Sequence, residues 1–202
     1  MATITKDELD ARVAGRTVLT EFRTTVEKFA DQTALRWMDE REKWQSMTFA
    51  EFGEHVARAA TGLRALGVER GDRVVLMVRN IPQFHWLDMA VLACGATPVS
   101  IYNSSSPEQI EYLVQHSEAK VAILEDDKFL ASFMKVRDRI PTVTDYVVLH
   151  PPADLPDRVH GPAIVTDQEP LDIDAAVAAS RPEDLATIIY TSGTTGNPKG
   201  VM

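Results

Sequence analysis

The sequence is poor in cysteine: Cys94 is the only one among its 202 residues. A single cysteine cannot form an internal disulfide, and disulfides are typical of secreted rather than intracellular proteins. We therefore expect a cytoplasmic protein in a reducing compartment. Cys94 stands between Ala93 and Gly95 in an apolar stretch. Such surroundings favour a small buried hydrophobe over a nucleophile.

Long hydrophobic runs are also missing. Residues 1–8 contain no apolar core of the kind that a signal peptide needs. The longest uncharged run, residues 89–107, is interrupted by Gly95, by Pro98 and by the polar cluster 103–106. That run is too irregular to span a bilayer, so we expect no integral membrane segment.

Basic clusters and metal-ligand patterns are absent as well. The chain has 21 basic against 30 acidic residues and a formal net charge of −9, which argues against nucleic acid and anionic membrane as partners. Its five histidines are scattered without metal-ligand spacing, so we expect surface or packing roles and no metal site. They are His55, His85, His116, His150 and His160.

The chain does contain short apolar runs that alternate with helical patterns. With 45% apolar and 25% charged residues it is typical of a globular protein of one domain or slightly more. The pattern predicts strands at 73–78, 98–101, 120–124, 145–149 and 185–190, and a hairpin at 34–38 and 44–47. It predicts helices near 18–29, 49–66, 82–93, 107–117, 129–140 and 171–179. Residues 150–170 are expected to form a surface loop.

Three helix starts carry a specific signal. Thr48 with Glu51, and Ser106 with Gln109, form capping boxes in which each side chain satisfies a backbone donor of the other residue. Pro82 suits the first turn of a helix. Strands and helices alternating at this spacing predict an α/β fold, a mostly parallel sheet with helices on both faces.

We further expect two segments: a loose, acidic arm over residues 1–16 and an α/β portion over residues 17–202. In parallel sheets of this kind, ligands bind beyond the carboxyl ends of the strands. The last predicted strand delivers residues 191–200 to that position.

That final stretch combines hydroxyls, glycines and one lysine. Glycine lets backbone N–H groups approach a ligand closely, and successive N–H groups form an anion-binding concavity. Hydroxyls add donors, and the lysine adds a mobile positive charge that suits phosphate oxygens. The predicted ligands of the ATP phosphates are Thr191, Ser192, Gly193, Thr194, Thr195, Gly196, Lys199 and Gly200.

Two commoner phosphate motifs do not fit this stretch. Walker A requires a lysine directly after its second glycine, and the dinucleotide fingerprint requires two glycines separated by one residue. An ordinary turn after a strand is the plain alternative, but a bare turn has no need of four hydroxyls, three glycines and a lysine together.

Residues 190–201, Tyr-Thr-Ser-Gly-Thr-Thr-Gly-Asn-Pro-Lys-Gly-Val, resemble the signature loop of the AMP-forming acyl-CoA synthetases, adenylation domains and firefly-type luciferases. In that superfamily the loop holds the β- and γ-phosphates of ATP while a carboxylate attacks the α-phosphate. Residues 96–106 and 108–112 are similar to bacterial long-chain fatty acyl-CoA synthetases.

The resemblance implies the N-terminal part of the adenylate-forming enzyme fold and of an ATP-dependent fatty acyl-CoA ligase. It implies ATP, Mg²⁺ and coenzyme A as cofactor and co-substrates, with a fatty acid as the other small-molecule partner. The family's magnesium ligand and catalytic lysine lie downstream, so no catalytic or metal-binding residue is expected here, and this chain alone is expected to be inactive. An adenylation or luciferase-like enzyme, a non-catalytic interaction module and a homodimer are left open.

Overall fold

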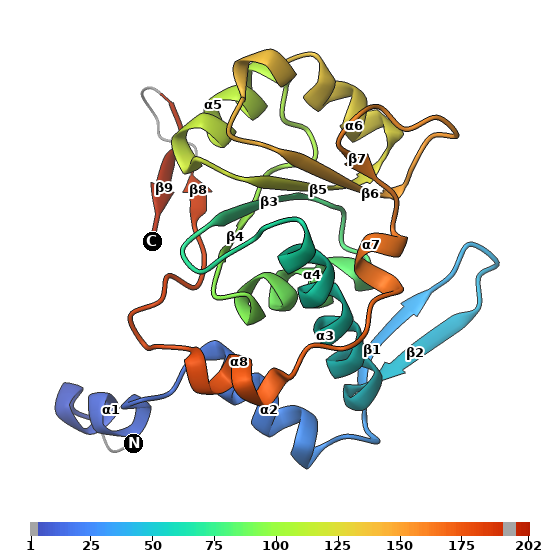
Figure 1. Ribbon diagram of the computed structural model, residues 1–202. Helices are drawn as coiled ribbons and strands as arrows, with labels where there is room; N and C mark the ends of the chain where they lie inside the picture. Colours follow the sequence, from blue (N-terminus) through green and yellow to red (C-terminus); the bar gives the residue numbers. More distant parts are fainter. Residues whose placement is uncertain (1–3, 192–196) are drawn as a thin grey trace.

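A five-stranded parallel sheet forms the centre of the molecule (Figure 1). The structure is a computed structural model that describes residues 4–191 and 197–202. The strand order is β4-β3-β5-β6-β7. On β3, for example, Val75 lies opposite Val99 of β4 on one side and Ala122 of β5 on the other. The strands are β3 (Arg73–Met77), β4 (Thr97–Ser100), β5 (Val121–Asp126), β6 (Asp145–His150) and β7 (Val159–His160). The predicted parallel sheet is confirmed.

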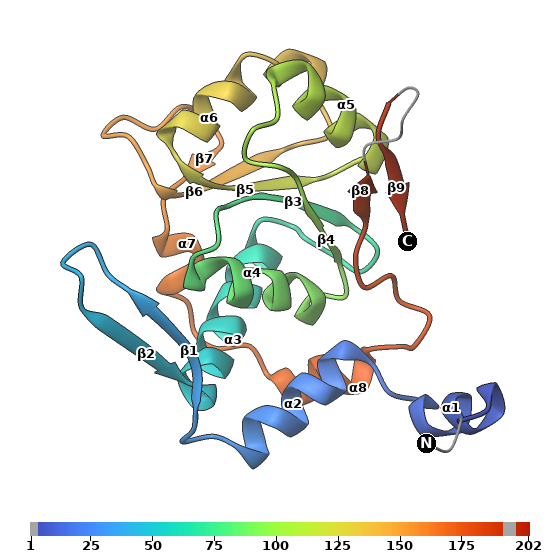
Figure 2. The same ribbon diagram turned by 180° about the vertical axis from the view of Figure 1, so that it is seen from behind.

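Helices cover both faces of this sheet, as predicted (Figures 1 and 2). Successive side chains of a strand point to opposite faces, so Val74 packs with one helix layer and Val75 with the other. The first layer holds α3 (Phe49–Ala65) and α4 (Pro82–Ala93), and the second holds α5 (Pro107–Ser117) and α6 (Asp127–Met134). Parallel sheets need this double cover, because both faces of their strands are apolar.

The helix starts lie where the capping signals place them. Thr48 and Glu51 exchange backbone-to-side-chain bonds of 2.8 and 3.2 Å at the start of α3. Ser106 and Gln109 do the same at the start of α5, at 2.9 and 3.3 Å. Local sequence alone is therefore enough to fix these boundaries.

The N-terminal elements lie beneath the first helix layer. They are α2 (Val18–Lys28) and the hairpin of β1 (Thr33–Met38) and β2 (Trp44–Thr48). Helix α8 (Ile173–Ala179), from the other end of the chain, packs beside α2. Residues 1–16 were expected to be a loose arm, but Lys6–Val13 forms a further helix, α1, capped by Thr5 and Glu8. None of its residues is buried, and the sequence signal available for it was the capping box of Thr5 and Glu8. The division at residue 16 stays a prediction.

Two other segments differ from expectation. The helix predicted over 129–140 ends at Met134, and a 3₁₀ turn, Arg137–Arg139, follows, while its apolar residues remain buried. The 150–170 segment contains β7, which extends the sheet, and a short helix, α7 (Ala163–Thr166). Both elements were too short for a period to show in the sequence. No helix in the described part of the chain has the length and apolarity needed to cross a bilayer.

The predicted strand 185–190 is wrong as a member of the parallel sheet. Residues Ile189–Thr191 form β8, which pairs antiparallel with β9 (Lys199–Val201) beside the sheet. Edge strand β4 explains the separation. Its Thr97 N–H donates inward to Asp72 O at 2.8 Å, so the next residue, Pro98, faces outward at the free edge.

Proline has no N–H, so this edge cannot offer a continuous ladder to another strand. The 185–188 segment attaches through side chains instead. The Thr97 hydroxyl donates to Leu185 O at 2.9 Å, and the Thr187 hydroxyl donates to Pro98 O at 3.4 Å. The sheet therefore ends at β4, and the chain that follows lies against it without joining it.

Two glycines in α3 offer a matched test of this packing. A Cβ on Gly62 would lie 1.7 Å from the backbone oxygen of Ile164 in α7, whereas a Cβ on Gly53 would meet the side-chain atom Val26 Cγ1 at 3.1 Å. We expect Gly62→Ala to lower the free energy of unfolding by about 1–3 kcal/mol through overpacking. Gly53→Ala should stay within about 1 kcal/mol of wild type, since the gain in helix propensity offsets the tighter contact. Urea unfolding of the two variants measures the difference, and equal stabilities would contradict the close approach of α3 and α7.

Candidate functional site

The β8–β9 hairpin has one exposed and one buried face. Its cross-strand pairs are Ile189 with Val201, Tyr190 with Gly200 and Thr191 with Lys199. Because side chains alternate along a strand, Thr191 and Lys199 share the exposed face, and Tyr190 points to the opposite one. Directly opposed residues on one face have neighbouring side chains. A hydroxyl and an ammonium group therefore stand side by side on the surface of the hairpin.

The hairpin lies at the carboxyl end of β4, where a ligand is expected in a parallel sheet. A cavity of about 380 Å³ separates the two elements, with Ser100 and Ile101 of the β4 end on one side and residues 187–190 on the other. Helix α4 contributes Asp88 to its wall. No described residue forms a hydrogen bond or an ion pair with the Asp88 carboxylate, and burial raises its pKa to about 6.

Helix α5 holds the buried face of the hairpin. The Tyr112 hydroxyl donates to Pro198 O at 2.8 Å, and His116 Nδ1 lies 2.8 Å from the Tyr190 hydroxyl. The rings of Tyr112 and His116 lie 5.5 Å apart, and the His116 and Tyr190 rings meet edge to face at 5.6 Å. Burial raises the pKa of Tyr190, so its hydroxyl stays protonated at neutral pH.

Sequence reasoning missed this cluster. His116 was expected to be a surface or packing residue, and Tyr112 was used only for the family resemblance. The available signal was their spacing: two aromatic residues four apart lie on the same face of a helix. Nothing in the sequence says which distant segment that face contacts.

Close packing also explains the last glycine of the stretch. A Cβ on Gly200 would lie 2.9 Å from Ile188 Cγ2 and 3.4 Å from the ring of Tyr190. Gly200 is thus required by the contact between β8 and β9. A positive φ angle plays no part, since Gly200 is not among the described residues that adopt one.

The predicted phosphate ligands fall into two groups. Thr191, Lys199 and Gly200 belong to the hairpin just described, and no described carboxylate pairs with Lys199. The others lie outside the described residues: Ser192, Gly193, Thr194, Thr195 and Gly196. Their assignment as ligands of ATP phosphates stays a prediction from the sequence.

A second place where a ligand could be expected is closed by ion pairs. The sheet changes direction between β3 and β5, because the chain leaves β3 toward β4 on one side and β5 toward β6 on the other. There the Arg79 guanidinium lies 2.7 Å from both Glu125 Oε1 and Asp126 Oδ2. The backbone N–H of Arg79 also donates to Glu125 Oε2 at 2.6 Å. The guanidinium also stacks over the Phe129 ring at 4.4 Å. This network fills the crevice.

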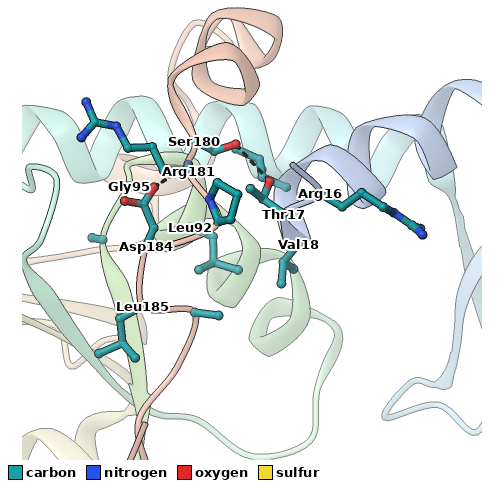
Figure 3. A pocket seen from close by; sticks show the side chains of 13 residues that line it. Arg16, Thr17, Val18, Leu92, Gly95, Ser180, Arg181, Asp184 and Leu185 are labelled. Carbon is teal, nitrogen blue, oxygen red and sulfur yellow. Dashed lines mark hydrogen bonds between the residues drawn. The ribbon is translucent and has the colours of Figure 1, made fainter. Parts of the chain in front are cut away.

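A second cavity, of about 180 Å³, lies between the start of α2 and residues 180–186 (Figure 3). Its hydroxyls are already paired: those of Thr17 and Ser180 lie 3.0 Å apart. Arg16 and Arg181 extend away from the cavity, and Asp184 pairs with Arg70. The cavity lies where two segments pack together, and no polar group of the described residues is free there to bind a ligand.

The single cysteine behaves as expected. Cys94 is buried, its thiol lies 3.5 Å from Ala60 O, and burial raises its pKa to about 11, which leaves no reactive thiolate at neutral pH. Within residues 4–191 and 197–202, no group of three or more His, Cys, Asp or Glu could hold a metal ion.

Comparison with known proteins identifies the class. The sequence pattern of the family described as AMP-binding enzyme matches residues 22–202. This chain belongs to that family, and the resemblance found in the sequence is confirmed.

The relatives of this chain include long-chain-fatty-acid–CoA ligases. The long-chain-fatty-acid–CoA ligase FadD15 of Mycobacterium tuberculosis is 37% identical over 158 residues, which are 78% of this chain and 26% of that protein. The long-chain-fatty-acid–CoA ligase ACSBG1 of Bos taurus is 28% identical over 198 residues, 93% of this chain and 26% of that protein. The chain thus spans about a quarter of the length of these relatives.

Solved structures confirm the fold. The N-terminal domain of FACL13 from Mycobacterium tuberculosis, an inhibitor-bound crystal structure, superposes with a TM-score of 0.67 at 25% identity, covering 92% of this chain and 44% of that one. The anthranilate CoA ligase AuaEII, crystallised with anthranoyl-AMP, gives a TM-score of 0.72 at 22% identity over 93% of this chain and 34% of that one.

Asp88 provides a test of the cavity beside β8. Its pKa is raised from 3.8 to about 6 by burial, so the folded protein binds this proton more tightly than the unfolded chain does. Stability from this group is therefore present below about pH 4 and is lost as the pH rises to about 6. We expect Asp88→Asn to raise the free energy of unfolding at pH 7.5 by about 1–2 kcal/mol and to flatten the decline between these pH values.

Urea unfolding across this pH range measures the effect. Asp154→Asn, at an exposed position, is the matched control and should leave the stability unchanged. Equal stabilities of Asp88→Asn and wild type at pH 7.5 would mean that water reaches this carboxylate freely.

Proposed function

We propose that this chain forms the ATP-phosphate-binding part of an AMP-forming long-chain fatty acyl-CoA ligase. The observation that carries the proposal is the pairing of Thr191 with Lys199 on the exposed face of a hairpin that lies beside edge strand β4. These two residues flank the stretch of glycines and hydroxyls at 192–196. A hydroxyl donor and an ammonium group at the two ends of such a stretch suit a polyphosphate.

The reaction has two steps. A carboxylate oxygen of the fatty acid attacks the α-phosphorus of ATP, and the bond to pyrophosphate breaks. The thiol of coenzyme A then attacks the acyl carbonyl, and AMP leaves. In the first step the positive charge of Lys199 would stabilise the negative charge that accumulates on the departing pyrophosphate. Ser192, Gly193, Thr194, Thr195 and Gly196 would add hydroxyl and backbone donors, on the strength of their sequence.

Mg²⁺ is part of the proposal through the family resemblance. The described residues hold no carboxylate cluster that fits it, so we derive no step through the ion. Magnesium commonly binds through substrate phosphates with few protein ligands, which is consistent with its arrival as Mg-ATP.

The choice of a fatty acid rests on the names of the relatives, several of which are long-chain-fatty-acid–CoA ligases. An adenylation or luciferase-like enzyme is the alternative within the superfamily, and a non-catalytic interaction module lies outside it. A cytoplasmic location agrees with the single buried cysteine. A homodimer has no support among the described contacts and is left to sedimentation measurements.

The proposal predicts a strong effect of Lys199→Ala. In the whole protein that contains this chain, fatty-acid-dependent exchange of pyrophosphate into ATP should fall roughly tenfold to a few hundredfold. This factor corresponds to losing one charge-assisted interaction of about 1.5–3 kcal/mol. Lys199→Arg should retain part of the rate, because it keeps the charge.

Lys128→Ala is the matched control, since Lys128 is an exposed residue of α6 on another part of the surface. An unchanged rate in a folded Lys199→Ala variant would remove the phosphate role of this lysine. A panel of acids separates the alternatives: exchange with an amino acid alone indicates an adenylation enzyme, and no exchange with any acid indicates a binding module.

A further inference from the structure

Helix α5 contacts both strands of the candidate phosphate-binding hairpin. On the β8 side, His116 of the helix bonds the hydroxyl of Tyr190. On the β9 side, Tyr112 of the helix bonds the backbone oxygen of Pro198, which directly precedes β9. The two helix residues are four apart, so they lie one turn from each other on the same face.

The two residues that α5 holds are adjacent in sequence to two of the predicted phosphate ligands. Tyr190 directly precedes Thr191, and Pro198 directly precedes Lys199. Fixing Tyr190 and Pro198 therefore fixes where the backbone of each ligand begins. A shift of either strand along α5 would change the distance between the Thr191 hydroxyl and the Lys199 ammonium group.

The contacts are specific rather than merely apolar. Tyr190 is only 5% exposed, and its buried hydroxyl would lose a partner if His116 were removed. Its ring also packs against Gly200 on the other strand, where a Cβ would lie 3.4 Å from two ring atoms. One tyrosine thereby connects the helix, β8 and β9.

The α5 contacts also compensate for the proline edge of the sheet. Only two side-chain bonds join residues 185–187 to β4 in the described structure, and no backbone ladder does. Without Tyr112 and His116, the hairpin would keep the backbone pairing of β8 with β9, but its described part would be held against α5 by apolar packing alone. Apolar packing is non-directional and does not define a register.

We propose that Tyr112 and His116 are positioning residues: they hold the hairpin in the position against α5 that places Thr191 and Lys199 for the phosphates of ATP. This role deepens the proposed function and, where it concerns ATP, rests on it. The anchoring of the hairpin by α5 stands independently of any nucleotide.

The test applies two measurements to the whole protein that contains this chain. Hydrogen exchange of peptides covering 188–191 and 197–201 reports the anchor, and pyrophosphate exchange reports ATP use. Tyr112→Phe removes one hydroxyl and keeps the ring, and His116→Leu removes the imidazole. Each should speed hairpin amide exchange and lower kcat/KM for ATP by roughly three- to tenfold, the effect of losing one buried hydrogen bond.

Three comparisons separate positioning from a general loss of structure. His116→Asn, which keeps a polar atom near the Nδ1 position, should recover much of the His116→Leu defect. The KM for the fatty acid and the exchange of β3, β5 and β6 should stay unchanged in all three variants. His85→Leu is the matched control: His85 is exposed on α4 and its imidazole bonds no described residue, so both measurements should equal wild type.

A double-mutant cycle adds a direct measure of the contact. The effects of His116→Leu and Tyr190→Phe should be less than additive, because both remove the same bond. Unchanged hairpin exchange in Tyr112→Phe and His116→Leu would overturn the anchor. Faster exchange with an unchanged kcat/KM for ATP, in an enzyme that Lys199→Ala impairs, would overturn the positioning role while leaving the proposed function intact. A wild-type protein without pyrophosphate exchange would overturn the proposed function, and the amide exchange would still decide the anchor.

Discussion

The architecture depends on one constraint, which is that a parallel sheet must bury both of its faces. Val74 and Val75 are adjacent, point in opposite directions and are both 0% exposed. Two helix layers achieve this here, because the crossovers that join parallel strands place helices on the faces of the sheet. The constraint extends to the polar end of the sheet, where Arg79 offsets the charge of Glu125, a carboxylate that is only 8% exposed. A buried carboxylate without such a partner would be costly.

The candidate site follows from the place where this constraint ends. Pro98 closes the free edge of β4 to backbone pairing, so the hairpin that carries Thr191 and Lys199 lies next to the sheet instead of extending it. Helix α5 thus has two roles. One side of it covers the sheet, with Ile110 and Val114 fully buried, and another side carries the two residues that bond the hairpin.

The sequence predicted the parts of the fold that depend on local chemistry. Capping boxes, proline at the first helical turn and short apolar runs identify most helices and the strands β3 to β6 of the parallel sheet, since each signal acts within a few residues. The sequence did not predict β7 or α7, which are too short to show a period, or α1, which buries nothing. It misplaced the strand at 185–190 because that run has strand composition, and only the outward direction of Pro98 shows that the edge is closed.

The candidate site shows the same division. Thr191, Lys199 and Gly200 were recognisable because their residue types suit phosphate and close packing. Tyr112 and His116 were not, because their importance arises from contact with residues 86 and 74 positions away in the chain. The Asp88 carboxylate was likewise invisible in sequence, since its altered pKa comes from a cavity that only the folded chain creates.

The buried cysteine has a practical consequence for spectroscopy. Cys94 is the only thiol in the chain, and both its 6% exposure and its pKa of about 11 protect it from alkylating reagents at neutral pH. A cysteine introduced on the exposed face of the hairpin would therefore be the one reactive position of these 202 residues. A fluorophore or spin label attached there would follow the hairpin selectively, against a native background that requires no prior removal of a thiol.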